Sequence, residues 1–114
     1  MSEITDQIWL GSYKDAANER FLGERKITHI LCCADELPLM VGFPYSSTLE
    51  GQKLTDIKEA AELLDIWASD GKKVMVYCSD GLGRSVSAVI EYLITYKQWS
   101  YMLAYDHLKL RRNI

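Results

Sequence analysis

One stretch of the chain combines a cysteine, two glycines and an arginine at a spacing that suits phosphate chemistry. Cys78 follows the apolar run 74–77, Arg84 comes after five intervening residues, and Gly81 and Gly83 lie between them. A glycine-bearing loop between a strand and a helix N-terminus directs backbone N–H groups at one spot, where the helix dipole also favours an anion. The same field lowers the pKa of a cysteine thiol, and an arginine can hold two phosphate oxygens in a fork. The stretch therefore predicts a thiolate nucleophile that attacks a bound phosphoryl group.

Each of these residues also has an ordinary structural interpretation. A cysteine here could be a buried thiol, and Ser85 could be a helix cap. Arg84 fits less well as a solvated residue, because a cation at a helix N-terminus opposes the dipole unless an anion offsets it. We therefore expect Cys78 to be the nucleophile, Arg84 to stabilise the transferred phosphoryl group, and Ser85 to donate a hydrogen bond to the thiolate. The predicted phosphate-binding residues are Ser79, Asp80, Gly81, Leu82, Gly83 and Arg84.

Strand-like and helix-like segments alternate on both sides of this loop. Three short apolar segments predict strands, and helical stripes of apolar residues follow them. The strand-like segments are 7–10, 27–33, 74–77 and, more weakly, 43–49, and the helix-like segments are 15–22, 55–67, 86–94 and 100–108. Asp15 and Thr55 are the expected N-cap residues of the first two helices. The pattern predicts an α/β fold in three layers, with a central, mostly parallel sheet of about four to five strands and helices on both faces. Ligands bind such sheets beyond the carboxyl ends of the strands, which is where the cysteine loop would lie.

Composition limits the classes of function. The chain has 114 residues, 48% of them hydrophobic, and a net charge of −3. We expect a single catalytic domain over 1–114 that acts as a monomer, with neither nucleic acid nor a membrane as partner. The N-terminus is acidic and lacks the apolar run of a signal peptide, and the three cysteines suit a reducing compartment, so the expected location is cytoplasmic. His29 and His107 lack metal-ligand spacing, and neither a metal nor another cofactor is expected.

The run from Cys78 to Ser85 resembles the Cys-x5-Arg-Ser/Thr signature of the cysteine-dependent protein phosphatases. Its late position resembles the dual-specificity phosphatases, whereas in low-molecular-weight tyrosine phosphatases and arsenate reductases the signature follows the first strand. Residues 8–17 and 27–31 look like the opening strand, first helix and second strand of the dual-specificity family, and 104–112 looks like its last helix. The resemblance implies a protein tyrosine phosphatase-like fold and a two-step reaction: Cys78 forms a cysteinyl phosphate, which water hydrolyses without a metal.

Two positions depart from the family pattern. The family usually has a histidine before the cysteine, and Tyr77 stands there, so the resemblance implies that Cys78 is less acidic than in relatives. The family's general acid is an aspartate in a Leu-Glu-Asp-like context, and Gly51 stands at that place. An unprotonated leaving group would lower the rate by about 10²–10⁴. Glu50 and Asp35 are alternative carboxylates.

Two further features bear on the predicted site. Asp80 lies inside the loop, where a carboxylate repels a phosphate dianion unless it is protonated or points outward. The start of the loop also resembles that of the myotubularins, lipid phosphatases with acidic groups there, so Asp80 is another candidate acid. Some relatives protect the nucleophile with a disulfide, and Cys32 or Cys33 could pair with Cys78. Neighbours on a strand point to opposite faces, so at most one of the two could do so.

Three functions remain open. The leading hypothesis is a protein phosphatase that acts on phosphotyrosine and phosphoserine/threonine in phosphorylated protein substrates, with low turnover. The second is a phosphatase-like binding module that keeps the phosphate cradle from Cys78 to Arg84 but hardly turns over. The third is a phosphoinositide phosphatase, which Asp80 suggests and the acidic net charge disfavours, because a lipid enzyme gains from a basic surface.

Overall fold

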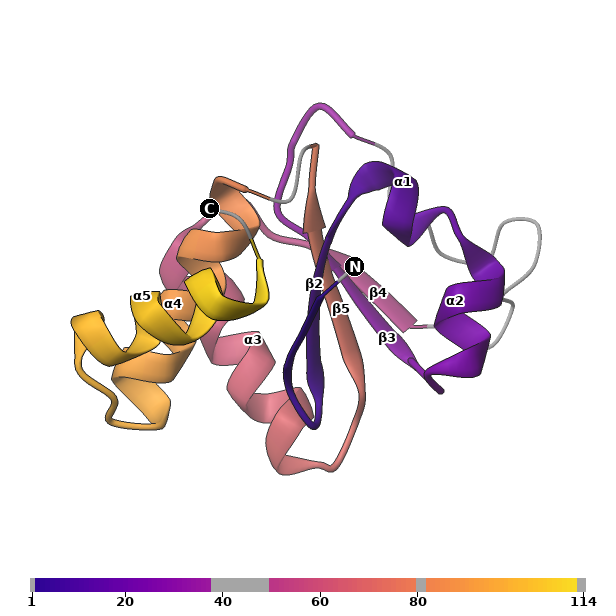
Figure 1. Cartoon of the computed structure of the whole chain (residues 1–114). Coiled ribbons are helices and arrows are strands. Elements are labelled where there is room, and N and C mark those ends of the chain that lie inside the picture. Colours follow the sequence, from indigo (N-terminus) through magenta and orange to yellow (C-terminus); the bar gives the residue numbers. More distant parts are fainter. Residues whose placement is uncertain (1, 38–49, 80–81, 113–114) are drawn as a thin grey trace.

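The computed structural model describes residues 2–37, 50–79 and 82–112. Within these ranges five strands form one sheet in the order β1-β2-β5-β3-β4 (Figure 1). The first strand pairs antiparallel with the second, and all other pairs are parallel. The strands are β1 (Ser2–Thr5), β2 (Ile8–Ser12), β3 (His29–Cys32), β4 (Glu50–Lys53) and β5 (Val74–Cys78).

Helices cover both faces of this sheet. The helices are α1 (Tyr13–Ala16), α2 (Glu19–Glu24), α3 (Ile57–Ser69), α4 (Arg84–Tyr96) and α5 (Tyr101–Arg111). In Figure 1, α1 and α2 lie on one side of the sheet, and α3, α4 and α5 lie on the other. This arrangement confirms the predicted three-layer α/β fold with a mostly parallel sheet. None of these described helices combines the length and apolar composition that crossing a bilayer requires.

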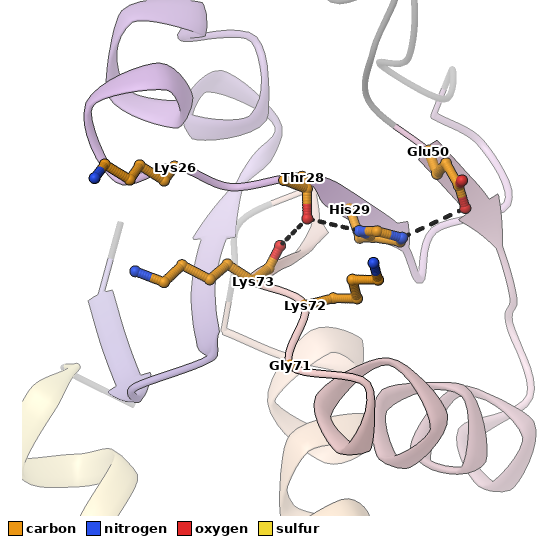
Figure 2. Close-up of a pocket in the computed structure, with 7 residues that line it drawn as sticks. All are labelled: Lys26, Thr28, His29, Glu50, Gly71, Lys72 and Lys73. Atoms are coloured by element: carbon orange, nitrogen blue, oxygen red, sulfur yellow. Dashed lines mark hydrogen bonds and ion pairs between the residues drawn. The ribbon is translucent and has the colours of Figure 1, made fainter.

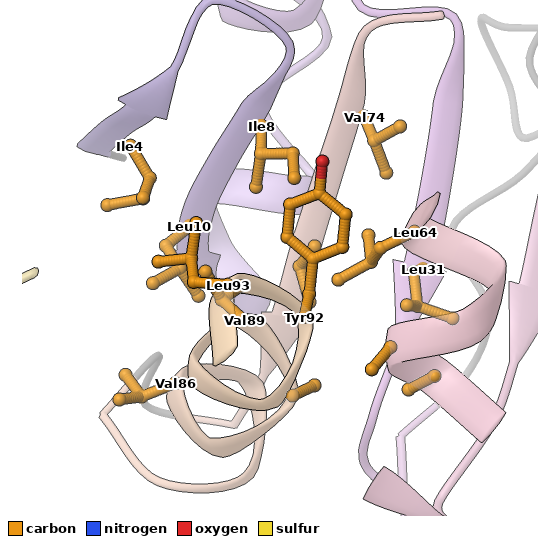
Figure 3. Packing of buried hydrophobic residues seen from close by; sticks show 14 of the residues in the cluster. Ile4, Ile8, Leu10, Leu31, Leu64, Val74, Val86, Val89, Tyr92 and Leu93 are labelled. Carbon is orange, nitrogen blue, oxygen red and sulfur yellow. The ribbon is translucent and has the colours of Figure 1, made fainter. Parts of the chain in front are cut away.

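The larger hydrophobic cluster lies between the sheet and the layer of α3, α4 and α5. Figure 3 shows side chains of the strands and of α3 and α4 meeting in it. Leu64 of α3 and Val89 and Leu93 of α4 are fully buried there, which holds both helices against the sheet. A second cluster packs α1 and α2 on the opposite face, and it contains Tyr77 and Cys78. The strand that carries the predicted nucleophile is thus covered on both sides.

The central strands are the ones that the sequence predicts. Every residue of β3 and of β5 is buried, in keeping with their continuous apolar runs. The two edge strands were not predicted. Both are polar, and β1 buries only Ile4 while β4 buries no residue. Because the pairing of a polar edge strand depends on its neighbour, local hydrophobicity does not reveal it. The edge strand predicted within 43–49 lies outside the described residues.

The helix starts differ from the predicted ones. The segment 15–22 forms two short helices instead of one, because Ser12 caps α1 and Asn18 caps α2. Asp15, the predicted cap, is instead the third residue of α1, and its carboxylate accepts a hydrogen bond from the backbone N–H of Ser12. Likewise Asp56, rather than Thr55, caps α3, and its carboxylate accepts a hydrogen bond from the N–H of Glu59.

Parallel pairing brings the ends of several strands to one edge of the sheet. Ser12, the last residue of β2, pairs in register with Cys78, the last residue of β5. On the other side of β5, Cys32 ends β3 at the level of Tyr77. The connections that follow these strands therefore converge around Cys78, as expected at the carboxyl edge of a parallel sheet.

Candidate active site

The sulfur of Cys78 lies next to the N-terminus of α4. Its Sγ atom is 3.0 Å from the Oγ atom of Ser85, in the first turn of that helix. The side chains are almost completely inaccessible, with Cys78 1% and Ser85 0% exposed. A thiolate can only accept, so when Cys78 is ionised the hydroxyl of Ser85 must be the donor. The structure thus brings together the predicted nucleophile and its predicted hydrogen-bond donor.

The start of α4 suits an anion. Gly83 is its N-cap residue, and no side chain of the described residues caps this helix. The first backbone N–H groups of an uncapped helix lack intrahelical partners, and their dipoles favour negative charge. The apolar stripe of Val86, Val89 and Leu93 buries the helix against the sheet, which fixes its first turn beside Cys78.

Arg84, the first residue of α4, binds the carboxylate of Glu36 with both terminal nitrogens. Nη1 donates to Oε2 at 2.8 Å, and Nη2 donates to Oε1. Glu36 belongs to the connection that follows β3. The hydrogen bond from Arg84 is the main reason that the pKa of Glu36 is lowered to about 2, with a smaller contribution from the charge of Lys53. The carboxyl group is therefore ionised at neutral pH.

Glu36 was not among the predicted site residues. The sequence contains a signal that could have found it, since Glu36 comes within four residues of the carboxyl end of a buried strand that neighbours the cysteine strand. Connections after such strands meet at the site in parallel sheets. In place of Glu36, the predicted site contains the adjacent Asp35. Its side chain is exposed, and its backbone carbonyl accepts a hydrogen bond from Lys53 Nζ at 3.1 Å.

Glu50 lies far from Cys78. It is the first residue of β4 and stands at the level of His29, which pairs in turn with Val74. Val74 precedes Cys78 by four residues, and at about 3.3 Å per residue these levels are roughly 13 Å apart along the strand. Glu50 instead lies 3.4 Å from Nε2 of His29. The geometry gives Glu50 no part in leaving-group protonation.

Gly51, assigned by resemblance to the place of the family acid, lies inside β4. It pairs with Ile30, which pairs with Met75, so it does not lie in a loop at the carboxyl edge. The connection that does lie there is short, because only two residues separate the end of β4 from the cap of α3 at Asp56. Gly51 thus matches the family acid in sequence context, but it does not lie at the carboxyl edge of the sheet, where the acid would be needed.

The predicted phosphate loop is described in part. The carbonyl of Ser79 accepts a hydrogen bond from the N–H of Tyr13 at 3.5 Å, and the side chain of Leu82 is exposed. Asp80 and Gly81, predicted as an acid and a phosphate-binding residue, lie outside the described residues.

The three cysteines are buried, and none forms a disulfide. Burial, with smaller effects of Cys32 and Cys78, raises the pKa of Cys33 to about 12. Cys33 is therefore a neutral thiol at physiological pH. Over the described part of the chain, no group of histidine, cysteine and carboxylate side chains is arranged to hold a metal ion.

A cavity of about 490 Å³ opens at the opposite end of the sheet (Figure 2). His29 lies in its wall between Thr28 and Glu50, and its Nδ1 atom is 2.8 Å from the hydroxyl of Thr28. The remaining lining residues are Lys26, Gly71, Lys72 and Lys73. Neither Cys78 nor Arg84 contributes, so this cavity is separate from the candidate active site.

Comparison with known proteins points to one family. The family model for the catalytic domain of dual specificity phosphatases matches residues 8–114. Dual specificity protein phosphatase 22 of Mus musculus is 33% identical over 101 residues, which cover 83% of this chain and 55% of that protein. Protein phosphatase Slingshot of Drosophila melanogaster is 30% identical over 122 residues, covering 98% of this chain and 11% of that protein. The chain thus spans about half the length of the first relative and much less of the second.

Solved structures share the fold at lower identity. Human DUSP28 superposes with a TM-score of 0.85 and 17% identity, over 98% of this chain and 80% of that chain. The human tyrosine phosphatase-like serine/threonine/tyrosine-interacting protein gives 0.83 and 23%, over 99% and 84%. PTPMT1 in complex with PI(5)P gives 0.76 and 17%, over 97% and 82%. At these identities the likeness establishes the fold alone.

Proposed function

Because the chain belongs to the dual specificity phosphatase catalytic-domain family, we propose that it hydrolyses phosphotyrosine and phosphoserine/threonine in protein substrates. The observation that carries this proposal is the 3.0 Å contact between Cys78 Sγ and Ser85 Oγ at the uncapped start of α4, next to Arg84. A buried sulfur, a serine donor and an arginine at one helix N-terminus provide a nucleophile and an anion site together.

In the first step the thiolate of Cys78 attacks phosphorus, and the bond from phosphorus to the ester oxygen breaks. Arg84 and the N–H groups at the start of α4 stabilise the charge on the phosphoryl oxygens. The electron pair of the broken bond stays on the leaving oxygen, which needs a proton. The products of this step are the free alcohol or phenol and a phosphoryl group bonded to the sulfur of Cys78.

In the second step water attacks phosphorus, and the sulfur–phosphorus bond breaks. The electron pair returns to sulfur, and the water loses a proton as inorganic phosphate forms. The hydroxyl of Ser85, 3.0 Å from the sulfur, donates to the departing thiolate and makes it a better leaving group.

We expect slow turnover compared with relatives that carry a histidine before the cysteine. Tyr77 is fully buried at that position and cannot supply the positive charge of an imidazolium. The buried thiols and the absence of disulfides suit a reducing compartment, which supports the cytoplasm as the place of action.

A phosphatase-like binding module is the second candidate. Tyr77 favours it, because it replaces a residue that assists turnover in the family without changing the run from Cys78 to Arg84. One structural neighbour carries the name of a phosphatase-like interacting protein. The structure adds no support for a phosphoinositide phosphatase, because Asp80, the residue that suggested it, lies outside the described part of the chain.

Turnover of an aryl phosphate and of a phosphotyrosine peptide, each with and without vanadate, tests the proposal. We expect activity that vanadate inhibits and that Cys78→Ser lowers by at least about 10³-fold, because the serine is not ionised at neutral pH. Ser87→Ala, on the exposed side of the same helix, is the control and should leave the rate unchanged. Tungstate binding without turnover in the unmodified protein would instead establish the binding module.

A further inference from the structure

The carboxylate of Glu36 lies at the atoms with which Arg84 would hold a phosphoryl group. Both terminal nitrogens of the guanidinium donate to it, Nη1 at 2.8 Å. Carboxylate and phosphoryl oxygens accept hydrogen bonds from a guanidinium in the same forked arrangement. A phosphoryl group bound by Arg84 would therefore have the carboxyl group of Glu36 as an immediate neighbour.

Glu36 also lies on the side where a leaving group must depart. Cys78 is 1% exposed and forms the floor of the site, whereas the side chains of Arg84 and Glu36 are 44% and 55% exposed. In phosphoryl transfer the attacking and leaving atoms are roughly in line through phosphorus. With sulfur at the floor, the leaving oxygen faces solvent, which is the side on which the carboxylate lies.

The backbone around Glu36 is held in place. The N–H of Leu37 donates to the carbonyl of Ala34 at 3.2 Å, which closes a turn with Glu36 near its tip. Ala34 is fully buried, and Leu37 packs against the second hydrophobic cluster. Lys53 from β4 donates to the carbonyl of Asp35 at 3.1 Å. A carboxylate on a turn anchored at both ends keeps its position relative to the start of α4.

We propose that Glu36 is the general acid of the reaction, a role that rests on the proposed phosphatase function. As the thiolate of Cys78 bonds to phosphorus and the ester bond breaks, the leaving oxygen takes the proton of the Glu36 carboxyl group. The resulting carboxylate then accepts a proton from the water that attacks the phosphoryl-cysteine, and Cys78 departs as a thiolate. The carboxyl group is thereby restored, and no other co-reactant is needed.

Substrate binding itself would prepare this acid. In the structure the hydrogen bond from Arg84 keeps the pKa of Glu36 at about 2. A phosphate dianion competes for the donors of Arg84 and adds negative charge beside the carboxylate, and both effects raise the pKa. Because the pKa is higher in the complex than in the free protein, binding takes up a proton, so substrate binds more tightly as pH falls through the pKa of the complex.

Two aryl phosphates that differ in leaving group test the role. Dinitrophenyl phosphate releases a stable anion and needs no acid, whereas phenyl phosphate does. We expect Glu36→Gln to lower kcat/KM for phenyl phosphate by about 10²–10³-fold and for dinitrophenyl phosphate by less than about fivefold. Glu36→Asp should recover part of the loss, and tungstate binding should not weaken in either variant. Glu24→Gln, which also removes a surface partner of an arginine, is the matched control and should behave like the unmodified protein.

Each alternative outcome has a distinct meaning. An equal loss on both substrates, with weaker tungstate binding, would show that Glu36 only orients Arg84, and the proposed role would be wrong. Full activity of Glu36→Gln on phenyl phosphate would overturn it as well. If the unmodified protein binds tungstate but hydrolyses neither substrate, the proposed function itself fails.

Discussion

Ser85 combines a buried position in the fold with a predicted role in the reaction. It is fully buried in the first turn of α4, and its hydroxyl contacts the sulfur of Cys78 at 3.0 Å. A serine can rotate its hydroxyl, so it can accept from a thiol or donate to a thiolate as the reaction requires. Its neighbour Arg84 is partly exposed and forms an ion pair with Glu36. The predicted nucleophile thus contacts its predicted hydrogen-bond donor, and the predicted phosphate ligand contacts the candidate acid.

The role of Ser85 predicts a change in which step limits turnover. Ser85→Ala removes a hydrogen bond to a charged sulfur, worth about 1.5–3 kcal/mol, so hydrolysis of the phosphoryl-cysteine should slow by roughly 10–10²-fold. The first step should be affected less, and rapid mixing with an aryl phosphate should show a burst of phenol followed by slow turnover. The exposed Ser87→Ala serves as the control. A slower burst with unchanged hydrolysis of the intermediate would contradict this role.

At the scale of elements, the connections after β2, β3 and β5 build the site. Ser12 ends β2 in register with Cys78, the turn with Glu36 follows β3, and α4 begins shortly after β5. The connection after β4 contributes less, because α3 begins almost immediately. The carboxylate of Asp56, which ends this connection, accepts a hydrogen bond from the N–H of Glu59 and caps α3.

Asp56 should therefore affect stability and not the reaction. Asp56→Ala should lower the free energy of unfolding by about 0.5–2 kcal/mol, because an N–H at the start of α3 loses its acceptor. Urea denaturation measures this loss, and Asp56→Ser should largely prevent it. Hydrolysis of phenyl phosphate by the folded variant should remain unchanged. A selective loss of that activity would instead identify Asp56 as the acid in place of Glu36.

At the scale of the whole molecule, the sheet is held between two layers of helices. The layer with α3 and α4 buries the larger hydrophobic cluster, and its packing against β5 holds the start of α4 beside Cys78. The opposite layer, with α1 and α2, covers Tyr77 and Cys78 from the other face. The environment of the sulfur therefore depends on both layers at once.

Two substitutions on α3 test whether the loss of stability follows the burial of the side chain, since both remove a large aliphatic group. Leu64 is fully buried, whereas Ile66, on the same helix, is 50% exposed. Leu64→Ala should lower the free energy of unfolding by about 2–5 kcal/mol through a cavity in the larger cluster. Ile66→Ala should change it by less than about 1 kcal/mol, since its side chain already contacts water. Urea midpoints measure both values, and equal losses would contradict the assigned core.

How far the sequence predicts this protein depends on how local each feature is. The strands β3 and β5 are continuously apolar and fully buried, so their composition alone reveals them. The polar strands β1 and β4 were not predicted, because their pairing partners decide them. The sequence predicts the cap of α3 one residue too early, at Thr55, because Thr55 and Asp56 are both good caps and only the backbone conformation distinguishes them.

The sequence by itself determined that Cys78, Arg84 and Ser85, the predicted nucleophile and its neighbours, lie together, because one short segment made of a strand, a loop and a helix carries all three. Only the tertiary structure decided which carboxylate approaches Arg84. Glu36 is 48 residues away along the chain and reaches it through the pairing of β3 with β5. The same pairing placed Gly51 and Glu50 away from the carboxyl edge of the sheet. Spacing along a chain describes contacts within a segment, whereas contacts between segments depend on strand order and register.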